Sequence, residues 1–171
     1  MKFFMPLLVL LTSHLCFARE FMTEQEFVSQ SFTEEPVMKS MWLKGEGQAA
    51  ALDILGHRYP ALRLRYWISG TKSAWILNEV GKEKPITIGI LIDGGTIEQV
   101  AILAYRESRG GEIRHPYFTG QFVGTGLQQD GDLDGVIDGI AGATLSVRAV
   151  RNVGRYALFL SALADTETSI N

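Results

Sequence analysis

The middle of the chain alternates short apolar runs with turn signals, which is the pattern of β-strands. The four runs span 62–68, 73–80, 86–92 and 96–105, and in the first of them basic residues alternate with apolar ones. Connections of only a few residues separate the runs, and the last connection carries two consecutive glycines. Consecutive strands joined by such short turns form an antiparallel meander. The pattern therefore predicts an antiparallel four-stranded sheet.

The longest helical pattern lies near the C-terminal end of the chain. Over 143–163 apolar residues recur at helical spacing, and Arg148, Arg151 and Arg155 occupy the polar side. The chain then turns polar, so we expect a frayed tail at 166–171. A helix of this kind buries its apolar face on the sheet. The predicted fold class is therefore α+β: an antiparallel four-stranded sheet with a C-terminal helix packed on it and short N-terminal helices.

Shorter helical patterns precede the sheet. Segment 19–35 mixes glutamates with phenylalanines as in a loose amphipathic helix, and Pro36 ends it. An alanine-rich run at 48–55 is a second short helix. These patterns divide the chain after the leader into an N-terminal helical segment, 19–60, and a main domain, 61–165.

The first residues have the pattern of a secretory signal. Lys2 supplies a positive charge, a nine-residue apolar run follows at 3–11, and small residues stand at both ends of the 16–18 triplet. The run is too short to cross a membrane, which takes about 20 apolar residues. We expect residues 1–18 to be removed as a signal peptide, leaving a periplasmic chain that begins at Arg19.

The composition excludes several classes of protein. Apolar residues make up 46% of the 171 residues and charged residues 20%, which is typical of a globular protein. Lys and Arg number 16 against 19 acidic residues, and a net charge of −3 argues against nucleic-acid binding. The single cysteine, Cys16, excludes an internal disulfide, a thiolate zinc site and a Cys-x-x-Cys-His haem attachment. A lipid anchor on Cys16 is disfavoured because Leu15 before it is not small, and an uncleaved anchor remains the alternative to a free exported chain.

An acidic loop at 130–138 begins like a calcium-binding EF-hand loop. Asp130, Asp132 and Asp134 occupy the first, third and fifth positions. The twelfth position, which needs a bidentate glutamate, is Ala141. A solvated acidic turn is therefore favoured over a metal site.

The residues directly after this loop favour phosphate binding. A helix is predicted to start beside Thr144, and the unpaired N–H groups and positive dipole of a helix start attract a phosphate. Gly142 and Ala143 leave room for a ligand near the backbone, and Thr144 and Ser146 add hydroxyls. The alternative is that Thr144 only caps the helix.

One string resembles the flavinylation motif of the FMN-binding domain family, namely Asp138-Gly-Ile-Ala-Gly-Ala-Thr-Leu-Ser146. In that family the motif is close to Asp-x-x-(Ser/Thr)-Gly-Ala-Thr-x-(Ser/Thr). Members include the periplasmic flavin subunits of the sodium-pumping NADH:quinone reductase and of the Rnf complexes. The resemblance implies that an extracytoplasmic FAD:protein FMN transferase joins FMN through its phosphate to Thr144. It also implies that the transferase reads Asp138 as part of its recognition sequence.

Most of the remaining positions agree with this motif. Gly142, Ala143 and Ser146 match it, and Leu145 stands at a variable position inside it. Ala141 departs from it, because serine or threonine is usual there. That change removes a hydroxyl but keeps a small side chain.

A second segment is similar to the same family. Family members carry Glu-Thr-Pro-Gly after a strand, and here Glu107-Ser-Arg-Gly110 follows the strand predicted to end at Tyr105. Glu107 and Gly110 match, whereas Arg109 replaces the proline. The resemblance covers about 70–165 and implies that Glu107 and Gly110 belong to the cofactor site.

The resemblance implies an exported flavoprotein that carries covalent FMN and passes electrons to partners such as a cytochrome or a membrane reductase, rather than a stand-alone enzyme. We expect the flavin ring to lie against the irregular segment 106–122. Candidate contacts that could stabilise anionic reduced flavin or pack beside the ring are Arg106, Arg109, Arg114, His115, Tyr117 and Phe118. The open alternatives are a flavin-dependent reductase with its own small substrate, a calcium-binding module and a flavin-free interaction domain.

Overall fold

The computed structural model describes residues 19–170. The predicted signal peptide, 1–18, lies outside these residues. Among the helices of the described part, none is long and apolar enough to cross a membrane.

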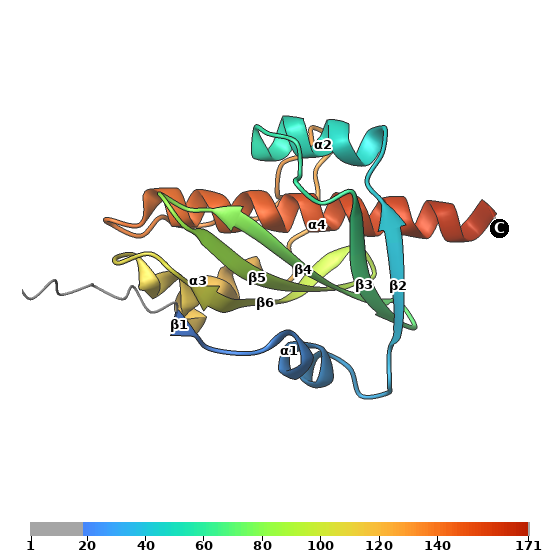
Figure 1. The fold of residues 1–171 in the computed structure, drawn as a ribbon, viewed down its shortest axis with the longest axis horizontal. Helices are drawn as coiled ribbons and strands as arrows, with labels where there is room; N and C mark the ends of the chain where they lie inside the picture. Colours follow the sequence, from blue (N-terminus) through green and yellow to red (C-terminus); the bar gives the residue numbers. More distant parts are fainter. Residues whose placement is uncertain (1–18, 171) are drawn as a thin grey trace, which may run out of the picture.

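A single antiparallel sheet of six strands forms the centre of the protein, in the order β1-β6-β5-β4-β3-β2 (Figure 1). The four predicted strands are confirmed, but the predicted number of four is wrong. The strands are β1 (Arg19–Glu20), β2 (Val37–Trp42), β3 (Arg63–Ser69), β4 (Lys72–Val80), β5 (Pro85–Asp93) and β6 (Thr96–Tyr105).

The two unpredicted strands lie at the edges of the sheet. β1 has only two residues and pairs with the end of β6, where Arg19 faces Tyr105. β2 pairs along its full length with β3, but its sequence shows no clean alternation and only Met41 is buried. An edge strand pairs with a neighbouring strand on one side only and needs no periodic apolar pattern. For this reason the local sequence did not reveal either strand.

Helices cover both faces of the sheet (Figure 1). α4 (Thr144–Ile170) packs on one face, with α2 (Glu46–Leu55) against it, and α1 (Glu24–Ser31) packs on the other face. β5 is buried on both faces: Ile88 and Ile90 point into the larger core with α4, while Leu91 belongs to the smaller cluster around Phe27 of α1. This arrangement confirms the α+β class and the packing of the C-terminal helix.

α1 is shorter than the predicted amphipathic segment, since it begins after Thr23 and ends at Ser31, before Pro36. Thr23 and Glu26 form a capping box at its start, with the Glu26 N–H 3.1 Å from the Thr23 hydroxyl. Phe27 is fully buried against Gly89 of β5, where a Cβ would stand 2.8 Å from the phenylalanine ring. α4, by contrast, is longer than predicted and continues through most of the expected polar tail.

The segment between β6 and α4 has little regular structure, as predicted. It contains the short turns η1 (Gly111–Arg114), α3 (Pro116–Thr119) and η2 (Gly120–Phe122). Phe118 and Phe122 are fully buried, with their rings 5.5 Å apart in an edge-to-face contact. Together with the buried Ile113 and Leu133, these two side chains anchor the segment to the core at one end of the sheet.

Candidate functional site

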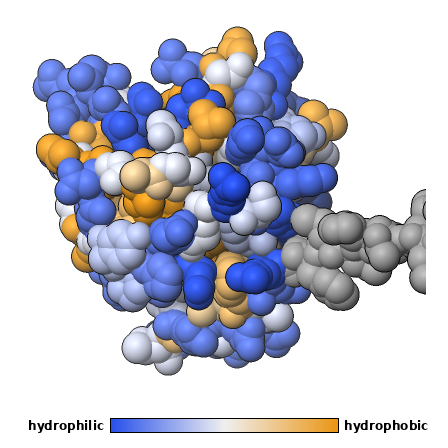
Figure 2. All heavy atoms as spheres, turned by 90° about the vertical axis from the view of Figure 1, so that its left-hand side faces the viewer, coloured by the Kyte–Doolittle hydropathy of each residue, from blue (hydrophilic) through white to orange (hydrophobic). Residues whose placement is uncertain are grey.

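Three segments distant in sequence meet at one end of the sheet. They are the β4–β5 turn at 81–84, the loop that follows β6, and the first turn of α4 (Figure 1). Gly81 lies at their meeting point, because a Cβ there would stand 3.2 Å from the Glu107 carboxylate and 3.3 Å from the Ser146 hydroxyl. Figure 2 faces this end of the molecule, whose surface is largely hydrophilic with scattered apolar groups.

Glu107 organises the β4–β5 turn. Its Oε1 accepts hydrogen bonds from the backbone N–H groups of Lys82, Glu83 and Lys84, at 2.7, 2.6 and 2.9 Å. Burial raises the pKa of Glu107, but the three N–H donors and the Lys82 ammonium lower it by more, so the pKa lies below its ordinary value. The carboxylate is therefore ionised at neutral pH and serves to hold the turn in place.

Tyr105 joins the loop after β6 to α4. Its hydroxyl donates to the carbonyl oxygen of Arg109 and lies 3.0 Å from the Ser146 Oγ. Gly110 next to this contact has a φ of +86°, and a Cβ there would stand 2.8 Å from the Tyr105 hydroxyl and 3.1 Å from Ala143 Cβ. Only glycine fits both the conformation and the space, which gives a physical reason for Gly110 at this position.

The first turn of α4 presents Thr144 to solvent. Val147 N–H donates to Ala143 O at 2.9 Å, so the N–H groups of Thr144, Leu145 and Ser146 precede the helical hydrogen bonds. Ser146 and Ala143 are buried, whereas Thr144 is exposed. Within residues 19–170 the Thr144 hydroxyl makes no hydrogen bond, so it does not cap the helix.

A hollow of about 570 Å³, which we call the threonine hollow, opens beside Thr144. It is lined by Lys82, Glu83, Glu107, Ser108, Arg109, Gly142, Ala143, Thr144, Leu145 and Ser146. Six predicted site residues thus meet in one place. Sequence analysis did not identify Lys82 and Glu83, because the pattern of the β4–β5 turn indicated only a connection between two strands.

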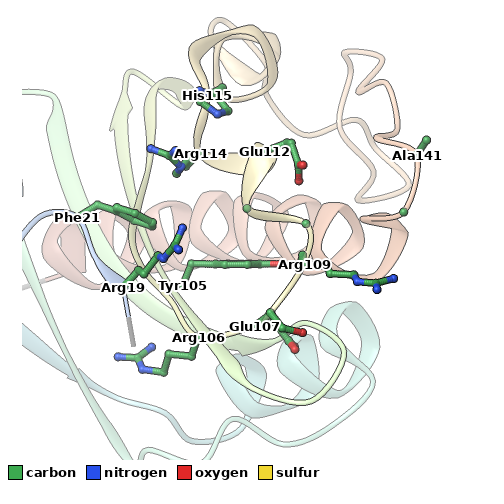
Figure 3. Close-up of a pocket in the computed structure, with 14 residues that line it drawn as sticks. Arg19, Phe21, Tyr105, Arg106, Glu107, Arg109, Glu112, Arg114, His115 and Ala141 are labelled. Carbon is green, nitrogen blue, oxygen red and sulfur yellow. Dashed lines mark hydrogen bonds between the residues drawn. The ribbon is translucent and has the colours of Figure 1, made fainter. Parts of the chain in front are cut away.

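A second hollow of about 630 Å³ adjoins the first, and we call it the basic hollow (Figure 3). The two share Glu107, Ser108, Arg109 and Gly142 in their linings. Gly110 lines the basic hollow, together with the following side chains labelled in Figure 3: Arg19, Phe21, Tyr105, Arg106, Glu112, Arg114, His115 and Ala141.

Three predicted residues, Asp138, Tyr117 and Phe118, line neither hollow. Asp138 is exposed, and its N–H donates to the Gln121 side chain at 2.7 Å. Phe118 is buried in the core, so it is not available to pack beside a flavin ring, and Tyr117 is 60% exposed. His115 stacks on Tyr117 with ring centroids 6.0 Å apart.

The carboxylates of the acidic loop point to different partners. Asp134 accepts from Gly126 N–H at 2.8 Å, and Asp130 accepts from Asp132 N–H at 3.0 Å. Asp132 Oδ1 lies 3.5 Å from Arg155 Nε on α4. Within the described residues no group of three His, Cys, Asp or Glu side chains is placed to hold a metal ion.

We expect any calcium affinity of this loop to be weak, on the order of millimolar, because the loop lacks the bidentate twelfth ligand. Calorimetric titration of chelator-treated protein with calcium measures it. A micromolar site that disappears in Asp132→Asn would contradict the expectation.

A comparison with known protein families finds a match to the region from the β4–β5 turn to the middle of α4, which supplies all of the lining of the threonine hollow and most of that of the basic hollow. Residues 81–158 match the family model of the FMN-binding domain. Comparison with curated proteins finds no relative that matches the chain. The matched region contains Glu107, Gly110 and the 138–146 string, and the match supports a flavin-binding role with FMN as the cofactor. β1 to β4, α1 and α2 precede the matched region.

Proposed function

We propose that this chain is an exported flavoprotein that carries FMN in a phosphoester bond to Thr144 and acts as an electron carrier. One observation supports the attachment site above all. The Thr144 hydroxyl is exposed at the threonine hollow, in the first turn of α4, and it makes no hydrogen bond within residues 19–170. A free hydroxyl in this position is available as a nucleophile.

The residues around Thr144 fit a phosphate. The N–H groups at the start of α4 and the positive end of the helix dipole favour an anion there. Arg109 lines the same hollow and adds positive charge, and Lys82 does so beside Glu83, whose carboxylate lies 3.6 Å from its ammonium. The Glu107 carboxylate is engaged with backbone N–H groups of the turn. Bound FMN supplies one- and two-electron chemistry, and the protein supplies attachment and electrostatics.

The proposed attachment uses FAD as the donor and an extracytoplasmic FAD:protein FMN transferase as the catalyst. The bond between Thr144 Oγ1 and the FMN phosphorus forms as the bond from that phosphorus to AMP breaks. The hydroxyl proton is released, and AMP leaves. Asp138 lies on an exposed part of the chain, which suits its proposed role as a residue that the transferase reads.

The proposal is tested by purifying the protein from cells that express the transferase. Flavin that stays with the chain after denaturation and precipitation supports covalent attachment. Flavin that is released into the supernatant shows non-covalent binding, and protein without flavin absorbance contradicts the flavoprotein role. Electron transfer is tested by mixing the reduced protein with an oxidised periplasmic cytochrome and following cytochrome reduction.

The export proposal makes a prediction about the N-terminus. Sequencing of exported protein should begin at Arg19, or within a residue or two, because the 16–18 triplet has the small residues that signal cleavage requires. Protein found only in membranes and still bearing Met1 would contradict a free periplasmic chain and indicate an anchored one.

A further inference from the structure

The N-terminal segment before the FMN-binding domain contributes to the basic hollow. β1 pairs with the end of β6, and the N–H groups of Phe21 and Met22 both approach Leu103 O, at 2.8 and 3.3 Å. These bonds fix the segment along the edge of the sheet. As a result Arg19 and Phe21, which lie about sixty residues before the matched domain, line a hollow built mainly by that domain (Figure 3).

The hollow concentrates positive charge in a chain whose net charge is −3. Four of the 16 basic residues of the chain line it: Arg19, Arg106, Arg109 and Arg114. Two glutamates also line it, but the Glu107 carboxylate is held by three backbone N–H groups of the β4–β5 turn. Within residues 19–170, Arg19, Arg109 and Arg114 have no ion-pair partner. Such a site favours an anion.

The hollow also offers flat surfaces. Phe21 is 40% exposed, and the Arg114 guanidinium lies over its ring, 5.0 Å from the centroid. Guanidinium groups and aromatic rings both stack on planar ligands. In Figure 3 Arg19, Phe21 and Arg114 lie on the same side of the hollow, while Arg109 points away from them, past Tyr105 toward the side of Ala141. The lining therefore suits a planar group that carries negative charge.

We propose that Arg19 and Phe21 form one wall of the site for the flavin ring, and that Arg19 and Arg114 stabilise the ring in its anionic reduced form. The inference rests on the proposed function, because Gly142 lines both hollows and stands two residues before the attachment residue Thr144. Uptake of two electrons from a reducing partner protein and of one proton converts the neutral ring into an anion. Cations beside the ring stabilise this product more than the neutral oxidised ring.

The test uses full-length protein carrying Thr144→Ala and free FMN, so it does not depend on covalent loading. The dissociation constants of oxidised FMN and, without oxygen, of dithionite-reduced FMN are measured by calorimetry. The phosphate contributes nearly equally to the binding of oxidised and of reduced FMN. The ratio of the two dissociation constants therefore reports how the site interacts with the flavin ring. We expect reduced FMN to bind more tightly. Arg19→Gln and Arg114→Gln should each lower this preference by about three- to fivefold, as for partly exposed ion pairs.

Two further variants separate charge from structure. Arg19→Lys should keep most of the preference for reduced FMN, because the positive charge remains. Arg58→Gln removes a positive charge from an exposed position near the end of α2 that lines neither hollow, and it should leave the preference unchanged.

The inference is wrong if free FMN does not bind, or if Arg19→Gln and Arg114→Gln behave like Arg58→Gln. Failure of the proposed function is seen separately, as the absence of covalent flavin on the chain that retains Thr144. In covalently loaded protein the same two arginine variants should lower the midpoint potential relative to Arg58→Gln, because a weaker preference for the reduced ring makes reduction less favourable.

Discussion

Thr144→Ala is expected to abolish the covalent attachment of FMN. The side chain of Thr144 is the exposed hydroxyl at the start of α4, and alanine removes the oxygen that would form the phosphoester. Intact-mass measurement of protein coexpressed with the flavin transferase should show the mass of FMN less one water on the parent chain. The variant should show the mass of the bare polypeptide.

Two control variants define what this result means. Thr144→Ser keeps a hydroxyl at the same place and should retain at least part of the mass increment. Ser108→Ala removes another exposed hydroxyl that lines the threonine hollow, and it should leave the increment intact. If the increment persists in Thr144→Ala, FMN is attached at a different residue.

Glu107→Ala is expected to lower the stability of the folded protein. The β4–β5 turn would lose the acceptor of three N–H groups. Hydrogen bonds to a charged group are stabilising, but the turn is partly exposed, so water replaces some of the hydrogen bonds that are lost. We therefore expect the free energy of unfolding to fall by about 2 kcal/mol at neutral pH. Urea unfolding monitored by tryptophan fluorescence measures the difference.

The stabilisation by Glu107 should depend on pH. Because the folded-state pKa of Glu107 lies below its ordinary value, its contribution is fully present above the ordinary pKa of the unfolded chain and is lost as the pH falls through the folded-state pKa. The difference between the parent chain and Glu107→Ala should therefore shrink in acid.

Neighbouring variants test the cause of this effect. Glu107→Gln keeps an acceptor oxygen without the charge and should lie between the parent and Glu107→Ala. Glu112→Ala, at an exposed glutamate of the basic hollow, should change the unfolding free energy by no more than about 0.5 kcal/mol. Equal effects of Glu107→Ala and Glu112→Ala would show that the turn does not depend on the carboxylate.

Local pattern by itself was enough to predict the elements that carry strong periodicity. The strands β3 to β6 alternate or run apolar between short turns, and the helices α2 and α4 carry apolar faces at helical spacing. The position of Thr144 at a helix start was also predicted, because the string from Asp138 to Ser146 is contiguous. Such features depend on neighbours within a few residues, so one segment specifies them.

The composition of the two hollows was decided only by the tertiary structure. Glu107 binds a turn more than twenty residues away in sequence, and Arg19 joins Arg114 only because β1 pairs with β6 at the sheet edge. Asp138 stands close to Thr144 in sequence, yet it lines neither hollow. The resemblance to a flavinylated family suggested which residues belong to the site, but strand order and loop packing determine which side chains meet. These depend on contacts between distant segments, and no local sequence pattern encodes them.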